Sequence, residues 1–179
     1  MSVQISRLNP PVGSRDHIQG PSYAPITLVE YGDFECPHCG KAYPMIKQLQ
    51  KHFGDLLRFV YRHFPISTVH PHAKNAAEAS EVAGAQSKFW KMHDQLFEHQ
   101  DALDDGSLRK YAMSLGLNID RFDKEMNSHA FASRVREDFL SGVRSGANGT
   151  PTFFINGVRY DGPLEYESLF RAVEDQISR

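Results

Sequence analysis

Cys36 and Cys39 are the only two cysteines among the 179 residues, and they lie in the tetrapeptide Cys36-Pro37-His38-Cys39. If Cys36 opens a helix, Cys39 follows one turn later on the same face, which brings the two sulfur atoms within bonding distance. Unpaired backbone N–H groups and the helix dipole favour a negative charge at a helix start. Because the thiolate is the nucleophile of disulfide exchange, the spacing predicts a redox-active pair in which Cys36 reacts.

The two residues between the cysteines suit this chemistry. Pro37 fits the first turn of a helix, where its missing N–H costs nothing. His38 can donate a hydrogen bond or carry a positive charge beside the sulfur. Two other interpretations stay open, a structural zinc site and a pair of inert buried thiols. Zinc sites usually need a second Cys/His pair, and the sequence has no second CxxC and only the distant His70 and His72 to offer. We therefore predict no metal site.

The composition limits the classes of function. Hydrophobic residues make up 40% and charged residues 23% of the chain, which is typical of globular proteins. The length suffices for one well-cored domain with a lobe inserted in it. The net charge is -2 and the basic residues are scattered, so nothing favours nucleic acid as a partner. No apolar stretch approaches the length of a membrane span. We also expect the protein to be a monomer.

The amino-terminal residues bear on location. Residues 1–10 contain no apolar core of the length that a signal peptide requires. We therefore expect a cytoplasmic protein if the chain is full length, and a periplasmic or extracytoplasmic one if a signal was removed. With both cysteines in the CxxC, no structural disulfide remains, which suits a reducing compartment.

Two strands and a helix are predicted around the cysteines. Residues 25–31 form a short apolar run that reads as a buried strand, and it leads directly into the CxxC. A helix is expected over 37–53, ending at Gly54, and a second strand over 56–64. This order predicts a parallel βαβ unit with a right-handed crossover. A strand, a tight turn and a helix start are the context of a thioredoxin-like redox motif.

The remainder of the chain divides into a helical part and a hairpin. Residues 66–147 contain no convincing strand, and we expect helices over 72–86, from Ser87, over 107–115, from Asn118 and over 130–145, with both named residues as caps. Asn156-Gly157 between two β-rich runs predicts a hairpin over 152–160, followed by a helix over 164–177. A short strand is expected near 3–8. These patterns predict an α/β fold with an all-helical insertion.

Several motifs occur together in this order. They are Glu30, Phe34, the CPHC tetrapeptide, the segment FWKMHD at 89–94 and the segment GTPTF at 149–153. In this combination the chain, from about residue 17 to 175, resembles the DsbA family of thiol-disulfide oxidoreductases. The resemblance implies a thioredoxin-like domain formed by residues 1–65 and 148–179, with residues 66–147 as an inserted helical domain after the second strand of the βαβ unit.

The resemblance also implies roles for individual residues. Cys36 would be the exposed nucleophile and Cys39 the buried resolving thiol, with Pro37 and His38 completing the motif. In the substrate-binding set, Pro151 would be a cis-proline facing the disulfide and Thr150 would offer its backbone to an extended peptide. Two residues complete that set: Gly149 and Phe34.

Glu30 interrupts an apolar strand six residues before Cys36. A strand buried on both faces would hold its carboxyl group in low dielectric and raise its pKa. Glu30 could then relay the proton of Cys39, and the family has an acidic residue at the matching position. The alternative is a glutamate at the strand end that reaches solvent.

The sequence therefore predicts a thiol-disulfide oxidoreductase that exchanges disulfides with cysteine-containing polypeptides and needs no metal or organic cofactor. Glutathione or a redox-recycling protein would be a further partner. The direction stays open, because the histidine of CPHC favours an oxidant whereas the cytosol would keep such a pair reduced. The alternatives are a glutathione-dependent transferase or isomerase of the same fold, and a zinc-binding or interaction module.

Overall fold

A mixed five-stranded sheet forms the centre of the computed structural model, which describes residues 5–177. The strand order is β1-β3-β2-β4-β5. Strands β2 and β3 are parallel, and the other neighbouring pairs are antiparallel. The strands are β1 (His17–Gln19), β2 (Ile26–Gly32), β3 (Leu57–His63), β4 (Thr152–Ile155) and β5 (Val158–Tyr160).

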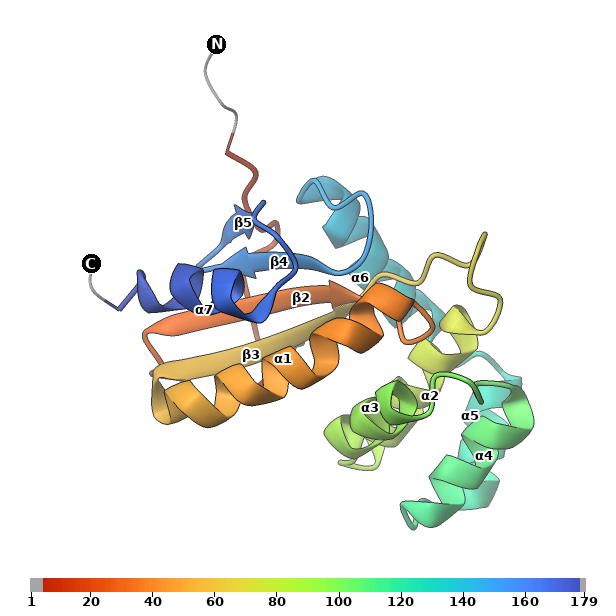
Figure 1. The fold of residues 1–179 in the computed structure, drawn as a ribbon. Coiled ribbons are helices and arrows are strands. Elements are labelled where there is room, and N and C mark those ends of the chain that lie inside the picture. Colours follow the sequence, from red (N-terminus) through yellow and green to blue (C-terminus); the bar gives the residue numbers. More distant parts are fainter. Residues whose placement is uncertain (1–4, 178–179) are drawn as a thin grey trace.

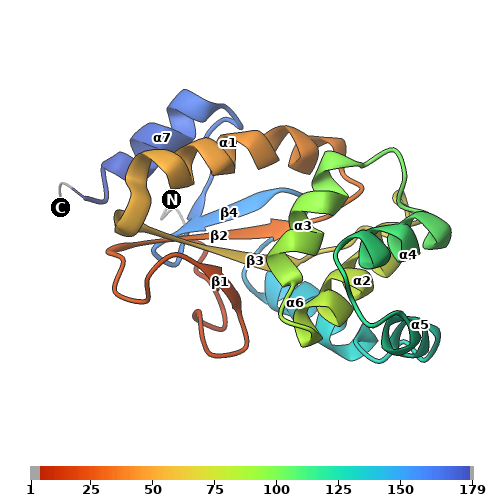
Figure 2. The same ribbon diagram turned by 90° about the horizontal axis from the view of Figure 1, so that it is seen from below.

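Helices cover both faces of this sheet (Figure 2). Helices α1 (Pro37–Phe53) and α7 (Tyr166–Glu174) lie on one face, and α6 (Ala132–Arg144) lies on the other. Helix α1 turns one apolar stripe toward the sheet, because its buried residues recur at helical spacing: Cys39, Ala42, Ile46, Leu49 and Phe53. A single turn of 3-10 helix, Gly54–Leu56, joins α1 to β3.

The helical insertion lies beyond the end of the sheet where β2 leads into α1 (Figure 1). It consists of α2 (Ala73–Ala85), α3 (Phe89–Glu98), α4 (Asp105–Ser114) and α5 (Ile119–Asn127), followed by α6. Nine of the thirteen residues of α2 are buried, and five of these are alanines, whose small side chains let neighbouring helices pack closely. The thioredoxin-like fold with a helical insertion after β3 is confirmed, and the exact domain limits at 65 and 147 stay predictions.

The hairpin of β4 and β5 follows the turn chemistry of its sequence. Asn156 and Gly157 have φ angles of 47° and 79°, and a two-residue hairpin turn of this kind needs positive φ at both positions. Asparagine and glycine adopt that conformation more readily than other residues. The predicted hairpin is therefore confirmed.

Other local predictions had mixed outcomes. Asn118 caps α5 by accepting a hydrogen bond from the backbone N–H of Arg121, as expected. Ser87 does not cap α3, because it has a φ of 62° and Lys88 holds the cap position instead. In the strand expected near 3–8, residues 3 and 4 lie outside the described residues, and Arg7 makes only an isolated bridge to Val158.

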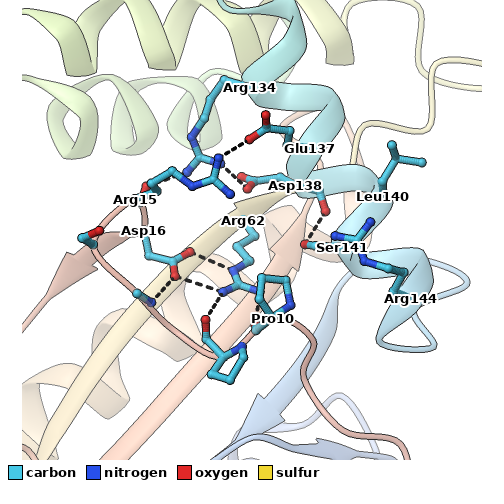
Figure 3. A pocket seen from close by; sticks show the side chains of 13 residues that line it. Pro10, Arg15, Asp16, Arg62, Arg134, Glu137, Asp138, Leu140, Ser141 and Arg144 are labelled. Atoms are coloured by element: carbon cyan, nitrogen blue, oxygen red, sulfur yellow. Dashed lines mark hydrogen bonds and ion pairs between the residues drawn. The ribbon is translucent and has the colours of Figure 1, made fainter.

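An ion-pair network fixes the segment before β1 to the α6 side of the sheet (Figure 3). Arg62 is buried and donates to both carboxylate oxygens of Asp16 at 2.8 and 2.9 Å, to the hydroxyl of Tyr31 and to the carbonyl of Pro10. A pocket of about 310 Å³ opens beside this network. None of the residues predicted to act in catalysis lines it, so the reactive centre must lie elsewhere.

Candidate active site

The two cysteines lie where β2 passes into α1. We call residues 33–36, which join the two elements, the active-site turn. Cys36 is the N-cap of α1, with φ -72° and ψ 122°, and Pro37 occupies the first turn. Both thiols are free. Cys36 is 4% exposed and Cys39 is fully buried, whereas Pro37 and His38 are exposed. Cys36 was expected to be exposed, but both cysteines are buried, and of the two only Cys36 keeps a small exposed area.

Hydrogen bonds to its sulfur lower the pKa of Cys36 to about 5. The largest contribution comes from the Cys39 thiol, burial opposes it, and the Thr150 hydroxyl and the backbone N–H groups of Cys39 and His38 add to it. The Thr150 hydroxyl is buried without another hydrogen-bond partner, so it is free to donate to the thiolate. At neutral pH Cys36 is therefore ionised. His38 contributes through its backbone.

Cys39 has the opposite electrostatic environment. Burial raises the pKa of its thiol well above the usual value, and the hydrogen bond to Cys36 and the charge of Glu30 raise it further. The pair therefore holds one ionised and one protonated sulfur. Such a division makes Cys36 the attacking and leaving group and leaves Cys39 in need of a base.

Glu30 lies in the middle of β2, with Tyr61 of β3 and Phe153 of β4 as its neighbours in the sheet. It is 2% exposed, so it does not reach solvent, and its Oε1 atom has no hydrogen-bond partner. Burial, with a smaller effect of the charge on Cys36, raises the pKa of Glu30 to about 8. The carboxyl group can therefore be either protonated or ionised near neutral pH.

The loop before β4 faces Cys36 from the other side. The peptide bond between Thr150 and Pro151 is cis, as the family resemblance implied. The Cys36 sulfur lies 3.5 Å from the carbonyl oxygen of Thr150, to which it can donate a hydrogen bond when it is protonated. Gly149, Thr150 and Pro151 are all half-buried. Thr150 therefore lies beside the sulfur, and Gly149 and Pro151 are its neighbours in the chain.

Phe34, which was predicted to belong to the substrate-binding set, is buried under the active-site turn. This side chain is 1% exposed and packs among aromatic rings, with centroids 5.1 Å from Tyr61 and 4.9 Å from Phe97. Phe97 comes from α3, more than sixty residues later in the chain. A ring that is enclosed in this way packs beneath the active-site turn, and its part in substrate binding stays a prediction.

Two carboxylates of the active-site turn bind the loop between β3 and α2, and the sequence did not reveal this. Asp33 accepts hydrogen bonds from the N–H of Ile66 at 2.9 Å and from Nδ1 of His70 at 2.8 Å. Glu35 accepts from the N–H of His72 at 2.7 Å and faces its Nδ1 at 2.9 Å. The paired spacing of acids at 33 and 35 and histidines at 70 and 72 is the signal that could have indicated it.

Across residues 5–177 no three His, Cys, Asp or Glu side chains come together in a way that could hold a metal ion. None of the helices described there combines the length and the apolar character that crossing a membrane requires.

Comparisons with known proteins agree with this geometry. The family model Thioredoxin_4, described as thioredoxin, matches residues 13–175. The chain belongs to this thioredoxin family. The structure of BdbD from Bacillus subtilis superposes with a TM-score of 0.81 at 25% identity, covering 92% of this chain and 94% of that one.

Two further solved structures share the fold. A thioredoxin-like oxidoreductase from Silicibacter pomeroyi has a TM-score of 0.81 at 24% identity and covers 97% of both chains. The α-DsbA1 protein of Wolbachia pipientis has a TM-score of 0.75 at 22% identity and covers 91% of both chains. The resemblance to the DsbA family is confirmed, and with it the prediction of a thiol-disulfide oxidoreductase.

A curated relative corrects the expectation on location. The chain is 46% identical over 174 residues to a protein of Mycobacterium sp. (strain KMS) named Na⁺/H⁺ antiporter NhaA 1. The match covers 96% of this chain but spans only 28% of that protein's length. The cytoplasmic location was inferred from the first residues of the sequence. A chain that corresponds to one segment of a longer membrane protein does not support that inference, so the prediction was wrong.

Proposed function

We propose that this chain exchanges disulfides with cysteine-containing polypeptides through Cys36 and Cys39. The observation that carries the proposal is the division of charge between the two sulfurs, with the pKa of Cys36 lowered to about 5 and that of Cys39 raised. A buried pair of inert thiols would not hold one sulfur ionised near the surface. The reaction needs no metal or organic cofactor, and glutathione or a redox-recycling protein would restore the pair.

The oxidising direction can be written from these groups. A substrate thiolate attacks Sγ of Cys36 in the oxidised pair, the bond between Cys36 and Cys39 breaks, and Cys39 leaves as a thiolate that takes a proton from Glu30. A second substrate thiolate then attacks the substrate sulfur of the mixed disulfide, and Cys36 leaves as a stabilised thiolate. The substrate loses two electrons, and the cysteine pair gains them.

The reverse direction uses the same groups. The Cys36 thiolate attacks one sulfur of a substrate disulfide, the substrate S–S bond breaks, one substrate thiolate leaves, and a mixed disulfide with Cys36 forms. The Glu30 carboxylate then accepts the proton of Cys39, and the new thiolate attacks Cys36 and releases the second substrate thiol. A carboxyl group with a pKa of about 8 suits both steps, because it can give or take a proton near neutral pH.

The substrate would bind as an extended peptide along residues 149–151. The Thr150 carbonyl lies beside Cys36, so a strand that pairs with this backbone would bring its own cysteine to the sulfur. Backbone pairing is tolerant of sequence, which fits a protein that acts on many polypeptides.

The low pKa of Cys36 favours oxidation of substrates over reduction. A stabilised thiolate lowers the free energy of the reduced pair and makes Cys36 a good leaving group. The reduced protein should therefore be the more stable redox form, and the protein should oxidise a dithiol peptide faster than it reduces a disulfide in insulin.

Serine variants of the two cysteines test the proposal. Cys36→Ser should abolish exchange, whereas Cys39→Ser should retain attack and accumulate a mixed disulfide with a cysteine peptide, visible as an added mass that dithiothreitol removes. A Ser114→Ala variant, at an exposed position of α4, serves as the control. The absence of any mixed disulfide in Cys39→Ser would contradict the proposed function.

A further inference from the structure

Gln100 connects the helical insertion to the backbone that carries Cys36. It follows α3, and its side chain is half-buried. Its Nε2 atom donates two hydrogen bonds of 2.9 Å, one to the carbonyl oxygen of Phe34 and one to that of Cys36. A side-chain amide has two N–H donors. Both therefore serve the active-site turn, although Gln100 comes more than sixty residues later in the chain.

The first turn of α1 leaves space for this amide at Gly40. A Cβ atom added to Gly40 would lie 2.0 Å from Oε1 and 2.7 Å from the side-chain carbonyl carbon of Gln100. Gly40 lies within α1, where glycine is a poorer helix former than alanine. The close approach of the Gln100 amide explains why a residue without a Cβ atom is favourable at position 40.

The same carbonyl oxygen of Cys36 takes part in the helix itself. It accepts a hydrogen bond of 3.0 Å from the N–H of Gly40, within the first turn of α1. The Gln100 amide donates a second hydrogen bond to this oxygen and also donates one to the carbonyl oxygen of Phe34. The backbone on both sides of residue 35 is thus held in place while the N–H groups of His38 and Cys39 face the sulfur.

We propose that Gln100 is a positioning residue for the thiol-disulfide exchange reaction, which holds residues 34–36 in the conformation that stabilises a negative charge on Cys36. This inference rests on the proposed function. The helical insertion then takes part in setting the reactivity of the sulfur, because its own side chain fixes the backbone of the active-site turn.

Replacement of the amide by a side chain of similar shape without donors tests the inference. In Gln100→Met the ultraviolet thiolate titration of Cys36 should move to higher pH by roughly half a unit to one unit. The equilibrium with glutathione should shift by roughly three- to tenfold toward the oxidised protein. Gly40→Ala should displace the amide and produce the same two shifts, and the double variant should show no further shift.

Gln95→Met is the matched control, because Gln95 lies on α3 and contacts His99 but not the active-site turn. It should leave the titration and the equilibrium unchanged. If Gln100→Met does not fold, the thiolate titration and the glutathione equilibrium of Gly40→Ala test the inference instead. A lower melting temperature with unchanged titration and equilibrium in the variants would show a merely structural role and overturn the inference. A wild-type protein that exchanges no disulfides would instead defeat the proposed function.

Discussion

The charge on Cys36 links the redox state of the protein to its stability. In the reduced protein the pKa of about 5 lies below the usual value for an unfolded cysteine, about 8.5. Thiolate stabilisation is therefore fully present above about pH 8.5 and is lost as the pH falls through 5. We expect the reduced form to melt above the oxidised form at pH 7.5 and the gap to narrow steadily toward pH 4. Calorimetry of both forms measures this gap, and a gap independent of pH would contradict the thiolate.

A second prediction at the scale of one residue concerns Glu30. Its effect on the stability of the folded protein changes with pH in the opposite direction to that of Cys36. Because burial raises its pKa to about 8, folded Glu30 keeps a proton that the unfolded chain releases above about pH 4.5. The wild type should lose stability relative to Glu30→Gln as the pH rises from about 4.5 to 8. The same variant should slow resolution of the mixed disulfide in stopped-flow measurements.

Glu174→Gln provides the control for Glu30, because Glu174 is an exposed residue of α7. It should change neither the stability difference nor the rate of resolution. If Glu30→Gln resolved the mixed disulfide at the wild-type rate, the proton relay would be wrong, even if the effect on stability were found.

At the scale of elements, one buried carboxylate joins α2 to two strands. Glu81 accepts from Nε2 of His17 on β1 at 2.8 Å and lies 2.7 Å from Nε2 of His63 on β3. Burial alone would raise the pKa of Glu81, but the two histidines outweigh it and hold the pKa well below its usual range. This stabilisation is present above about pH 4.5 and is lost on acidification.

Glu81→Ala should therefore destabilise the protein by about 3 kcal/mol at pH 7, because it leaves the buried His63 and the half-buried His17 without their partner. Glu137→Ala is the matched control. It removes a surface pair with Arg15 whose side chains are 70% and 52% exposed, and such pairs contribute less than about 1 kcal/mol. Urea unfolding compares the two, and equal losses would contradict a special role for the Glu81 pairs.

At the scale of the whole molecule, elements defined by local pattern were predictable. The βαβ unit, the helix that starts after Cys36 and the hairpin at Asn156-Gly157 each follow from apolar periodicity and turn residues within a short window. Strand β1 was not predictable in this way, because it has only three residues and pairs with β3 more than forty residues away.

Long-range packing explains what the sequence left out of the site. Phe34 was assigned to the substrate-binding set from the family resemblance, and its burial was not foreseen because the ring of Phe97 that packs on it comes from the distant helix α3. The contacts of Gln100 and of His70 with the active-site turn likewise join distant segments. Location was not predictable from the first residues. The curated relative matches this chain over only 28% of its own length, so those residues carry no information on where such a protein is located.

The thiolate absorbance of the reduced protein as a function of pH tests the central claim most directly. We predict a change equivalent to one sulfur with a midpoint near pH 5, which disappears in Cys36→Ser, because Cys39 stays protonated until far higher pH. A first thiolate that appears only near pH 8–9, the range of an ordinary cysteine, would contradict the account.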